Sequence, residues 1–246
     1  MLLQGLEVDY TRFFSSDTQY MRASEIRELL KLTEGRNVIS LAGGLPDPST
    51  FPRGELAEIA KYVIEEYGSK ALQYSPTKGV TLYRESLADF LYRNRQIKAG
   101  AESIVVTTGS QQALDIVART LINPGDYVVV EEPTYLAALN VFRIRRPNFV
   151  GVPIDDEGMK VDVLEEKLRR LKSEGKQVKL LYTVPIAQNP SGVTLSYERK
   201  KRLLELAEEY DFLIIEDNPY GYILFEDMEI KHLKALDKSG RVIYLS

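Results

Sequence analysis

The feature that most constrains this sequence is an alternation of short β-branched runs with helical stretches, which begins near residue 103 and continues to residue 246. IVVTTG precedes the helical pattern QQALDIVARTLI, and the same alternation joins YVVVEE to LAALNVF, FVGVPI to VDVLEEKLRRL and VKLLYTV to ERKKRLLELAEEY. FLIIED and VIYLS are two further apolar runs. Strands that are apolar on both faces and separated by helices predict an α/β fold of three layers, α/β/α, with a mostly parallel sheet. Ligands of such sheets bind outside the carboxyl ends of the strands.

The part of the chain before this alternation is predicted to be helical. Ser24 is a suitable N-cap for a first amphipathic helix, and Gly35 lies just past its end. The segment GGLPDPSTFP predicts a loop, because its glycines and prolines do not fit regular structure. Apolar residues at helical spacing over residues 56–67 predict a second helix that ends at Gly68, and residues 82–94 predict a third.

Composition excludes several kinds of chemistry. The chain has 246 residues, 44% of them hydrophobic, which suits one large domain or one domain and part of another. It contains no cysteine, which excludes disulfides, thiol nucleophiles, cysteine-bound zinc and iron–sulfur clusters. Its single histidine, His232, excludes histidine triads and multi-histidine metal sites. We therefore expect no metal.

Charge and hydropathy narrow the partners and the location. The net charge is −4, charged residues of both signs make up 28% of the chain, and no basic run occurs, so we expect no nucleic acid. Neither a signal peptide nor an apolar run of about 18 residues is visible, which predicts a cytoplasmic protein without a membrane partner. The absence of cysteine and the many Glu, Lys and Arg residues suit a thermophile. Because VIYLS has the pattern of an interior strand, we expect the natural protein to continue beyond Ser246.

The first candidate site lies in TTGSQQALD, where a strand turns through Gly109 into a helix that begins at Ser110. Free backbone N–H groups at Ser110, Gln111 and Gln112, the helix dipole and the serine hydroxyl would attract an anion such as a phosphate. An ordinary serine N-cap is the alternative interpretation, and it is favoured for this segment taken alone. The glycine spacing fits neither a dinucleotide fold nor a P-loop.

The second candidate is Asp217 in IIEDNPYG, with Tyr220 three residues later. A carboxylate at the end of a buried strand faces the ligand crevice, and it could hold a proton on a heteroaromatic nitrogen through a charge-assisted bond. Metal binding is a competing use, although no second acidic cluster or histidine pairs obviously with Asp217. A capping aspartate is an equally good interpretation of this residue alone.

Two further strand ends carry Asn189 and Tyr135. Asn189 precedes a proline in PIAQNPSG, which biases it away from helix, and its amide could bond a phenolic oxygen or a carboxylate. A routine Asn-Pro turn is the alternative. Tyr135, in EEPTYLAAL, could stack on a flat ligand or pack in the core. Together, four strand ends supply an anion site, an acid, an amide and an aromatic ring.

These motifs resemble the fold type I enzymes that use pyridoxal 5'-phosphate (PLP), in the subgroup of 2-aminoadipate, kynurenine and aromatic aminotransferases. The resemblance runs from about Ser24 to the end of the chain, through ASEIRELLKLTE, SLAGGLPDPSTFP, LQYSPTKG, TTGSQQALD, EEPTY, QNPSG and EDNPYG. It implies that residues 1–45 form an N-terminal arm and substrate-recognition helix. Residues 46–246 would then form a PLP-binding large domain that is incomplete at its C-terminus, with a small C-terminal domain absent from this chain.

The resemblance also implies roles for individual residues. Ser110 and Gln111 would hold the cofactor phosphate, and Tyr135 would stack on the pyridine ring. Asn189 and Tyr220 would bond the phenolic oxygen of the ring. Asp217 would bond the pyridine nitrogen, which makes Asp217, Tyr220 and Asn189 the catalytic candidates.

Four other positions would serve the substrate, together with Asn189. Gly44 would lie beside the substrate carboxylate, and Tyr74 would reach the site of the neighbouring subunit in a homodimer. Ser24 and Arg27 would belong to a mobile element that recognises the substrate side chain, and the arginine could pair with an acidic group or move aside for an aromatic one. Amino acids and 2-oxo acids are the implied substrates.

The chain departs from the family pattern at two places. The Schiff-base lysine of the family follows the strand that matches VIYLS, in a segment of the type S-F-S-K beyond Ser246. PIAQNP lacks the aromatic residue often found two positions before Asn189. The expected function of the complete protein is transamination, and the fragment alone is expected to be inactive. Alternatives are a non-catalytic cofactor-binding or dimerising fragment and a PLP-dependent lyase or decarboxylase.

Overall fold

The computed structural model describes residues 8–22, 44, 46–223, 225 and 230–246, and the first predicted helix, with Ser24 and Arg27, lies outside these residues. The chain divides into two compact units. The sheet unit comprises residues 1–22, 93–98 and 107–246, and the helical unit comprises residues 23–92 and 99–106. The predicted domain boundary at residue 45 stays a prediction.

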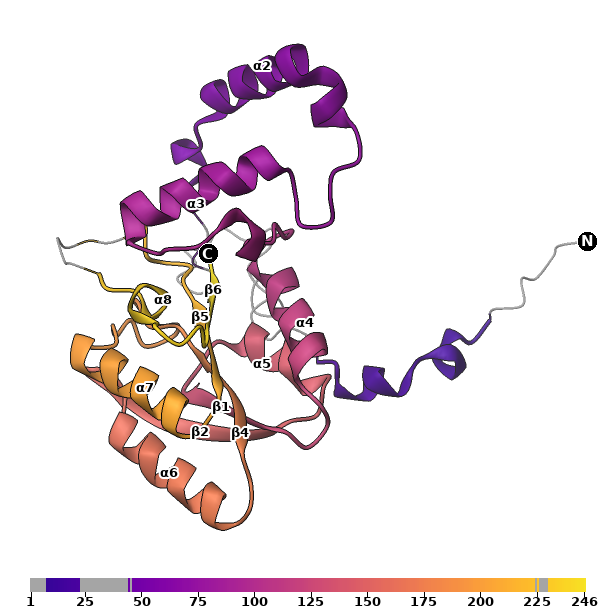
Figure 1. The fold of residues 1–246 in the computed structure, drawn as a ribbon. Coiled ribbons are helices and arrows are strands. Elements are labelled where there is room, and N and C mark those ends of the chain that lie inside the picture. The colour runs from indigo at the N-terminus through magenta and orange to yellow at the C-terminus, as the bar shows by residue number, and fades with distance from the viewer. Residues whose placement is uncertain (1–7, 23–43, 45, 224, 226–229) are drawn as a thin grey trace, which may run out of the picture. The chain divides into compact units, whose positions relative to one another are not determined.

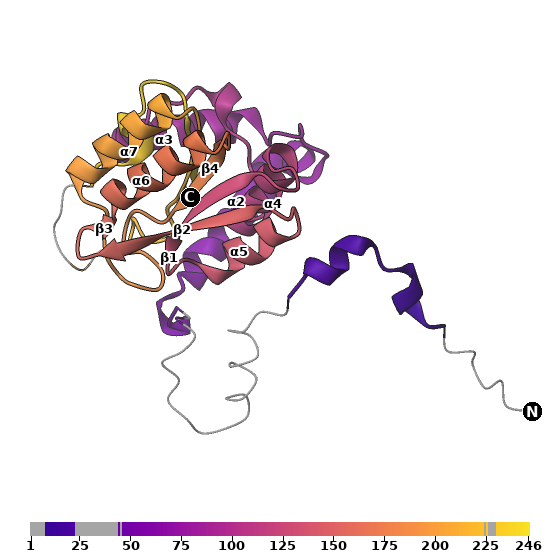
Figure 2. The same cartoon turned by 90° about the horizontal axis from the view of Figure 1, so that it is seen from below.

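The sheet unit contains a six-stranded sheet in the order β3-β2-β1-β4-β5-β6. Its neighbouring strands are parallel, except that the short β3 pairs with β2 in antiparallel register. The mostly parallel α/β sheet is thus confirmed (Figure 1), and β3 is an addition that the sequence did not predict (Figure 2). The strands are β1 (Tyr127–Glu132), β2 (Asn148–Asp155), β3 (Gly158–Met159), β4 (Val178–Thr183), β5 (Leu213–Asp217) and β6 (Val242–Leu245).

Helices cover both faces of this sheet. Figures 1 and 2 show α4 and α5 on one face and α6 and α7 on the other. The alternation of side chains along β1 explains the two cores: Val128 and Val130 pack in the cluster that contains residues of α4 and α5, whereas Val129 packs with residues of α6 and α7. The helices of this unit are α4 (Ser110–Leu121), α5 (Leu136–Arg143), α6 (Val161–Ser173), α7 (Tyr197–Glu209) and α8 (Leu233–Leu236).

One predicted strand is wrong. Residues 104–107 of IVVTTG have no strand structure, although the sequence is rich in β-branched residues. The backbone N–H of Val106 donates to the carbonyl of Lys78 at 3.0 Å, so this segment bonds to a loop instead of to a neighbouring strand. High β-propensity describes a good fit to a pleated surface and does not supply the partner that a strand requires.

The helical unit contains α2 (Arg53–Leu72) and most of α3 (Thr81–Arg95), which continues into the sheet unit. The described residues also include four short 3-10 helices. The second predicted helix is confirmed, but it runs through Gly68 to Leu72, because a single glycine weakens a helix by only about 1 kcal/mol. No residue of α2 is buried. The 3-10 helices are η1 (Tyr10–Phe13), η2 (Ser16–Tyr20), η3 (Pro48–Thr50) and η4 (Ala101–Ser103).

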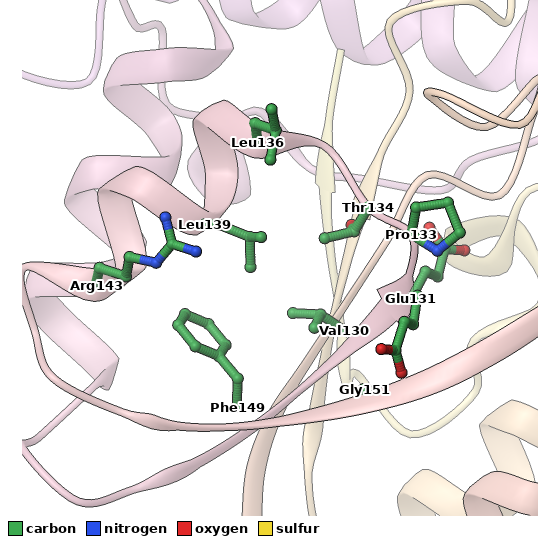
Figure 3. A pocket seen from close by; sticks show the side chains of 10 residues that line it. Val130, Glu131, Pro133, Thr134, Leu136, Leu139, Arg143, Phe149 and Gly151 are labelled. Atoms are coloured by element: carbon green, nitrogen blue, oxygen red, sulfur yellow. The ribbon is translucent and has the colours of Figure 1, made fainter. Parts of the chain in front are cut away.

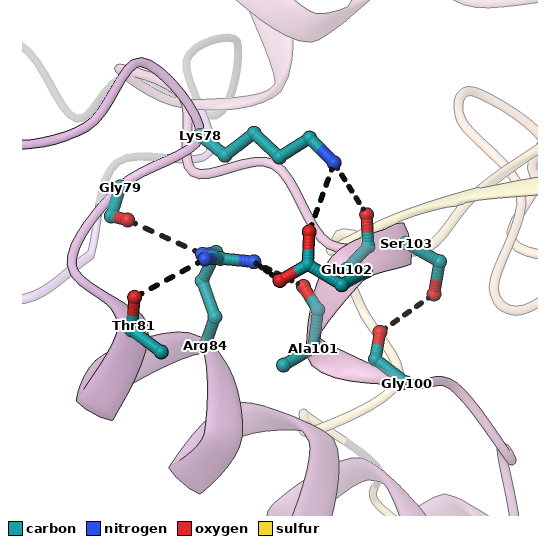
Figure 4. Close-up of polar contacts among 8 residues, drawn as sticks. All are labelled: Lys78, Gly79, Thr81, Arg84, Gly100, Ala101, Glu102 and Ser103. Carbon is teal, nitrogen blue, oxygen red and sulfur yellow. Dashed lines mark hydrogen bonds and ion pairs between the residues drawn. The ribbon is translucent and has the colours of Figure 1, made fainter.

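A buried arginine organises the start of α3, as Figure 4 shows. The Arg84 guanidinium donates to the carbonyl oxygens of Gly79, at 3.2 Å, and Ala101. Its pair with Glu102 is longer, at 3.5 Å, and Lys78 Nζ donates to the carbonyl of Glu102 at 2.8 Å. These contacts fasten residues 99–106 to the loop before α3. Within the described part of the chain, no helix is both long and apolar enough to cross a membrane.

Candidate functional site

The carboxyl ends of β1, β4 and β5 bring buried polar residues to one edge of the sheet. These strands are parallel neighbours, so their ends meet at the same edge. The buried polar residues at or just after these ends are Glu131, Thr183, Gln188, Glu216, Asp217 and Asn218. The predicted location of the site, at the carboxyl edge, therefore coincides with a concentration of buried polar groups.

Asp217 is the last residue of β5 and is 3% exposed. Two residues earlier, Ile215 packs in the α4 and α5 cluster, so the strand alternation directs Asp217 to the same face. The Tyr182 hydroxyl donates to Asp217 Oδ2 at 2.8 Å. Burial raises the pKa of Asp217, and this bond opposes the rise without cancelling it. Asp217 is in none of the ion pairs found among the described residues, so it has no cationic partner in that part of the chain.

Tyr135, Asn189 and Tyr220 lie near this carboxylate. Asn189 Nδ2 donates to the Tyr220 hydroxyl at 3.0 Å, which brings together two residues that the sequence placed in separate motifs. Tyr135 immediately precedes α5, and its pKa is raised by burial and by the nearby Asp217 and Tyr220. Tyr135 and Tyr220 also pack against the same apolar cluster. The structure therefore gathers four of the predicted residues at one place.

The turn that carries Asn189 is held by the residue before it. Gln188 is 3% exposed, and its backbone N–H donates to the carbonyl of Val193 at 2.8 Å. The Asn189–Pro190 peptide bond is cis, and Ala187 has a positive φ of 46°. Ala187 occupies the position where the family pattern often has an aromatic side chain, and its N–H donates to Thr194 Oγ1 at 3.1 Å. With alanine at this position, the turn is held by hydrogen bonds to the Val193 carbonyl and the Thr194 hydroxyl.

Glu131, near the end of β1, is a buried acid that the sequence analysis did not single out. Its carboxylate accepts from Thr183 Oγ1 at 2.6 Å, from the Val184 N–H at 3.2 Å and from Gln188 Nε2 at 3.1 Å. Burial raises the pKa of Glu131 to about 7, against the opposing effect of these donors. The sequence around Glu131, Gln188 and Tyr182 has the pattern of an ordinary strand or turn. The only signal that could have identified these residues as part of the site is a polar group within an apolar run.

The segment predicted to bind an anion forms the start of α4. Ser110 is the first helical residue and Gly109, with φ of 82°, is the N-cap, so the interpretation of Ser110 as the N-cap is wrong. No side chain caps this helix, and Ser110 and Gln111 are exposed. The first N–H groups of a helix have no intrahelical partner and attract anions. One turn later, Leu114 packs in the cluster that Tyr135 and Tyr220 contact.

The donor set fits a flat heteroaromatic phosphate ester such as PLP. An uncapped helix start suits a phosphate, a buried carboxylate without a cation suits a protonated ring nitrogen, and an amide with a phenol suits a phenolic oxygen. Among the described residues, no group of three or more His, Asp or Glu residues could hold a metal ion. Gly44 and Tyr74 lie in the helical unit, where Tyr74 is 99% exposed, and their roles stay predictions.

A pocket of about 370 Å³ lies beside the site, between α5 and the strands β1 and β2 (Figure 3). Val130, Leu139 and Phe149 line its middle, and Arg143 reaches it from α5. The lining includes none of Asp217, Asn189, Tyr220 or Ser110. The pocket is therefore distinct from the candidate site, which is defined by the strand ends.

Comparisons with known proteins agree with this geometry. The family model "Aminotransferase class I and II" matches residues 36–245. Aromatic-amino-acid aminotransferase 1 of Thermococcus litoralis is 54% identical over 243 residues, which are 99% of this chain and 58% of that protein. The 2-aminoadipate transaminase of Thermus thermophilus is 37% identical over 97% of this chain and 58% of its own length. The chain thus spans somewhat more than half the length of these relatives.

A solved structure also matches the fold. The crystal structure of Pyrococcus horikoshii kynurenine aminotransferase, in complex with PMP, with KYN as substrates and KYA as products, has a TM-score of 0.90 and 54% identity. The match covers 96% of this chain and 58% of that one. The three-layer α/β architecture predicted from the sequence is confirmed by this similarity.

Proposed function

The chain belongs to the class I and II aminotransferase family, and on that premise we propose that the whole protein is a PLP-dependent aminotransferase. It would move an amino group from an amino acid, such as 2-aminoadipate or an aromatic amino acid, to a 2-oxo acid such as 2-oxoglutarate. The observation that carries the proposal is the buried Asp217 carboxylate, which lacks a cation and lies near the bonded pair of Asn189 and Tyr220.

Six residues of this chain would hold the cofactor, Asp217 among them. The N–H groups and hydroxyl at the start of α4, from Ser110 and Gln111, would bind the phosphate. Tyr135 would pack against one face of the ring. Asn189 and Tyr220, which bond each other at 3.0 Å, would both reach the phenolic oxygen.

Asp217 is the central residue of the proposed mechanism. When bound, PLP supplies an electron sink for the carbanion formed at the substrate, and this sink works best with a protonated ring nitrogen. The Asp217 carboxylate would hold that proton at the nitrogen, because a buried anion stabilises an adjacent cation strongly. The Tyr182 hydroxyl favours the ionised form of this carboxylate by donating to Oδ2 at 2.8 Å, against the burial that raises the pKa of Asp217.

Asn189 and Tyr220 would orient the ring and stabilise negative charge at its phenolic oxygen. The amide donates without changing charge, and the tyrosine hydroxyl is placed by that same amide. Tyr135 would exclude water from the ring face. The covalent anchor and proton shuttle of the family is a lysine that we place beyond Ser246.

Substrate recognition involves residues whose roles the sequence alone predicts. We propose that Ser24 and Arg27 recognise the side chain and that Gly44 lies beside the substrate carboxylate. Tyr74 would reach the partner's site in a homodimer, and its full exposure is compatible with that role. A cytoplasmic location and a thermophilic source belong to the same proposal, and a melting temperature typical of mesophilic proteins would contradict the latter.

The proposal is tested with the complete protein. We expect purified protein with PLP to produce glutamate from 2-oxoglutarate and each of 2-aminoadipate, kynurenine and phenylalanine, at rates that rank its preference. Release of ammonia or carbon dioxide without glutamate would identify a lyase or decarboxylase instead. Failure to bind PLP at all would overturn the proposal.

A further inference from the structure

Gln188 uses every hydrogen-bonding position of its side-chain amide. Nε2 donates to Glu131 Oε2 at 3.1 Å and to the carbonyl of Pro133 at 2.8 Å. Oε1 accepts from the N–H of Ser191 at 2.9 Å and from its hydroxyl at 2.7 Å. A primary amide has two donor hydrogens and two acceptor lone pairs, so this side chain is fully satisfied.

These four bonds join two segments that are distant in sequence. The bonds to Ser191 close the turn that begins with Asn189, directly after Gln188. The bond to the Pro133 carbonyl holds the segment that leads into Tyr135, two residues further along. One buried amide therefore connects the residue proposed to bond the phenolic oxygen of the cofactor with the residue proposed to pack on its ring.

Glu131 is a second acceptor for the NH₂ end of the amide, beside the Pro133 carbonyl. Its carboxylate is held by Thr183 Oγ1 and the Val184 N–H, and it accepts from Gln188. The Pro133 carbonyl can only accept and the Ser191 N–H can only donate, so the NH₂ end of Gln188 faces Pro133 and Glu131 and its oxygen faces Ser191. Glu131 lies two residues after Val129, whose side chain packs on the α6 and α7 face. The strand alternation therefore places the Glu131 side chain on that face, opposite the face of Asp217.

We propose that Gln188 and Glu131 are a pair of positioning residues that fix Asn189 relative to Tyr135, and thereby fix the cofactor ring between them. Neither side chain would touch the cofactor, and the inference rests on the proposed function for the identity of that ligand. A carboxylate at position 188 would repel Glu131, and a cationic side chain could not accept from Ser191. An amide is the side chain that satisfies both neighbours.

The test uses the complete protein with Gln188→Met, which keeps the length of the side chain but removes all four bonds. Bound PLP absorbs visible light, and its circular dichroism in that band reports how the ring is held. We expect the variant to lose much of this signal per bound cofactor and kcat to fall about ten- to a hundredfold. The absorbance band of bound PLP also reports protonation of the cofactor. The pH midpoint of this change should rise by about one unit, because a phenolate that accepts a weaker hydrogen bond from a displaced Asn189 stabilises the protonated cofactor more strongly.

A second readout needs no cofactor. Without PLP, hydrogen exchange should become faster in both residues 131–136 and residues 186–194 of the Gln188→Met variant. Faster exchange in the turn alone would show that the two segments are not linked, and it would overturn the inference even in a protein that binds no PLP. A wild-type protein that binds no PLP would separately overturn the proposed function.

Two further variants complete the design. Glu131→Gln retains an oxygen that can accept from Gln188, so we expect a smaller change in the same readouts; a change as large as that of Gln188→Met would contradict the role of Gln188 as the residue that joins the two segments. If Gln188→Met does not fold, Glu131→Gln is compared with the wild type, and unchanged circular dichroism with unchanged exchange in both segments would overturn the inference. Leu203→Ala, in the core beneath α7, lowers stability without touching the turn. If it reduces the circular dichroism per bound cofactor as much as Gln188→Met does, the effect reflects stability alone.

Discussion

Two aspartates of the sheet unit have buried side chains, but their surroundings shift the two pKa values in opposite directions. Asp237, between α8 and β6, has a side chain that is 1% exposed and accepts from the N–H groups of Gly240 and Val242, both at 2.9 Å. Lys234 Nζ lies 3.3 Å from its Oδ2. Burial alone would raise the pKa of Asp237, but the backbone donors and Lys234 outweigh it and lower that pKa. Asp217 has the Tyr182 hydroxyl instead, and its pKa is raised.

Under the proposed function, this difference separates a structural acid from one that binds the cofactor. Asp237 is satisfied by its own chain, which leaves no electrostatic demand for a ligand. Asp217 is buried without a cationic partner among the described residues, its pKa is raised, and acids perturbed in this way are typical of active sites. The distinction predicts opposite consequences when each carboxylate is neutralised.

The largest expected effect is on turnover in Asp217→Asn of the complete protein. Loss of a buried charge partner costs about 3–5 kcal/mol. That corresponds to a fall in kcat of roughly a hundred- to a thousandfold or more. Folding stability without cofactor should be unchanged or higher, because an uncompensated buried charge is removed. Steady-state kinetics and urea unfolding measure both quantities, and near-normal turnover with PLP bound would contradict the role of Asp217.

Glu131 is a third buried acid of the sheet unit, and burial raises its pKa as it does that of Asp217. Its pKa is about 7 in the folded chain against 4.5 in the unfolded one, so its contribution to stability is fully present below pH 4.5 and is lost as the pH rises through about 7. The shift corresponds to roughly 3 kcal/mol. Glu131→Gln should therefore lack that part of the decline between pH 5 and pH 8. Urea unfolding at both pH values tests this, and equal declines in both proteins would refute it.

Asp237→Asn should show the reverse pattern to Asp217→Asn. An amide has one oxygen and an NH₂ group that cannot accept from a backbone N–H, so charge-assisted bonds to the 237–242 turn are lost, at a cost of about 2 kcal/mol. Because the pKa of Asp237 is lowered, the wild-type stabilisation is present above pH 3.8 and is lost as the pH falls further. The variant should lack this acid-side loss. PLP binding and kcat should stay near wild type; a large loss of turnover would remove the distinction between the two aspartates.

The sequence identified candidate residues that follow the ends of strands. It did not identify residues whose role depends on hydrogen-bond partners from other parts of the chain. Asp217, Asn189 and Tyr135 could be found because each follows an apolar run, where a parallel sheet exposes its carboxyl edge. Gln188 and Tyr182 could not, because their roles depend on donors and acceptors from other strands. The strand expected over residues 104–107 failed for the same reason, since local propensity carries no information about the neighbour.

The smallest effect is expected for Tyr182→Phe, which removes one hydroxyl and leaves the ring against Phe142. A hydrogen bond to a charged group contributes about 1.5–3 kcal/mol, so kcat/KM should fall roughly tenfold. Without this donor the pKa of Asp217 rises further, and the acid limb of the pH–rate profile should move to higher pH. Tyr127→Phe, at the amino end of β1, is the matched control and should leave the profile unchanged. If both variants shift the acid limb alike, the Tyr182 hydroxyl does not lower the pKa of Asp217, and burial alone determines that pKa.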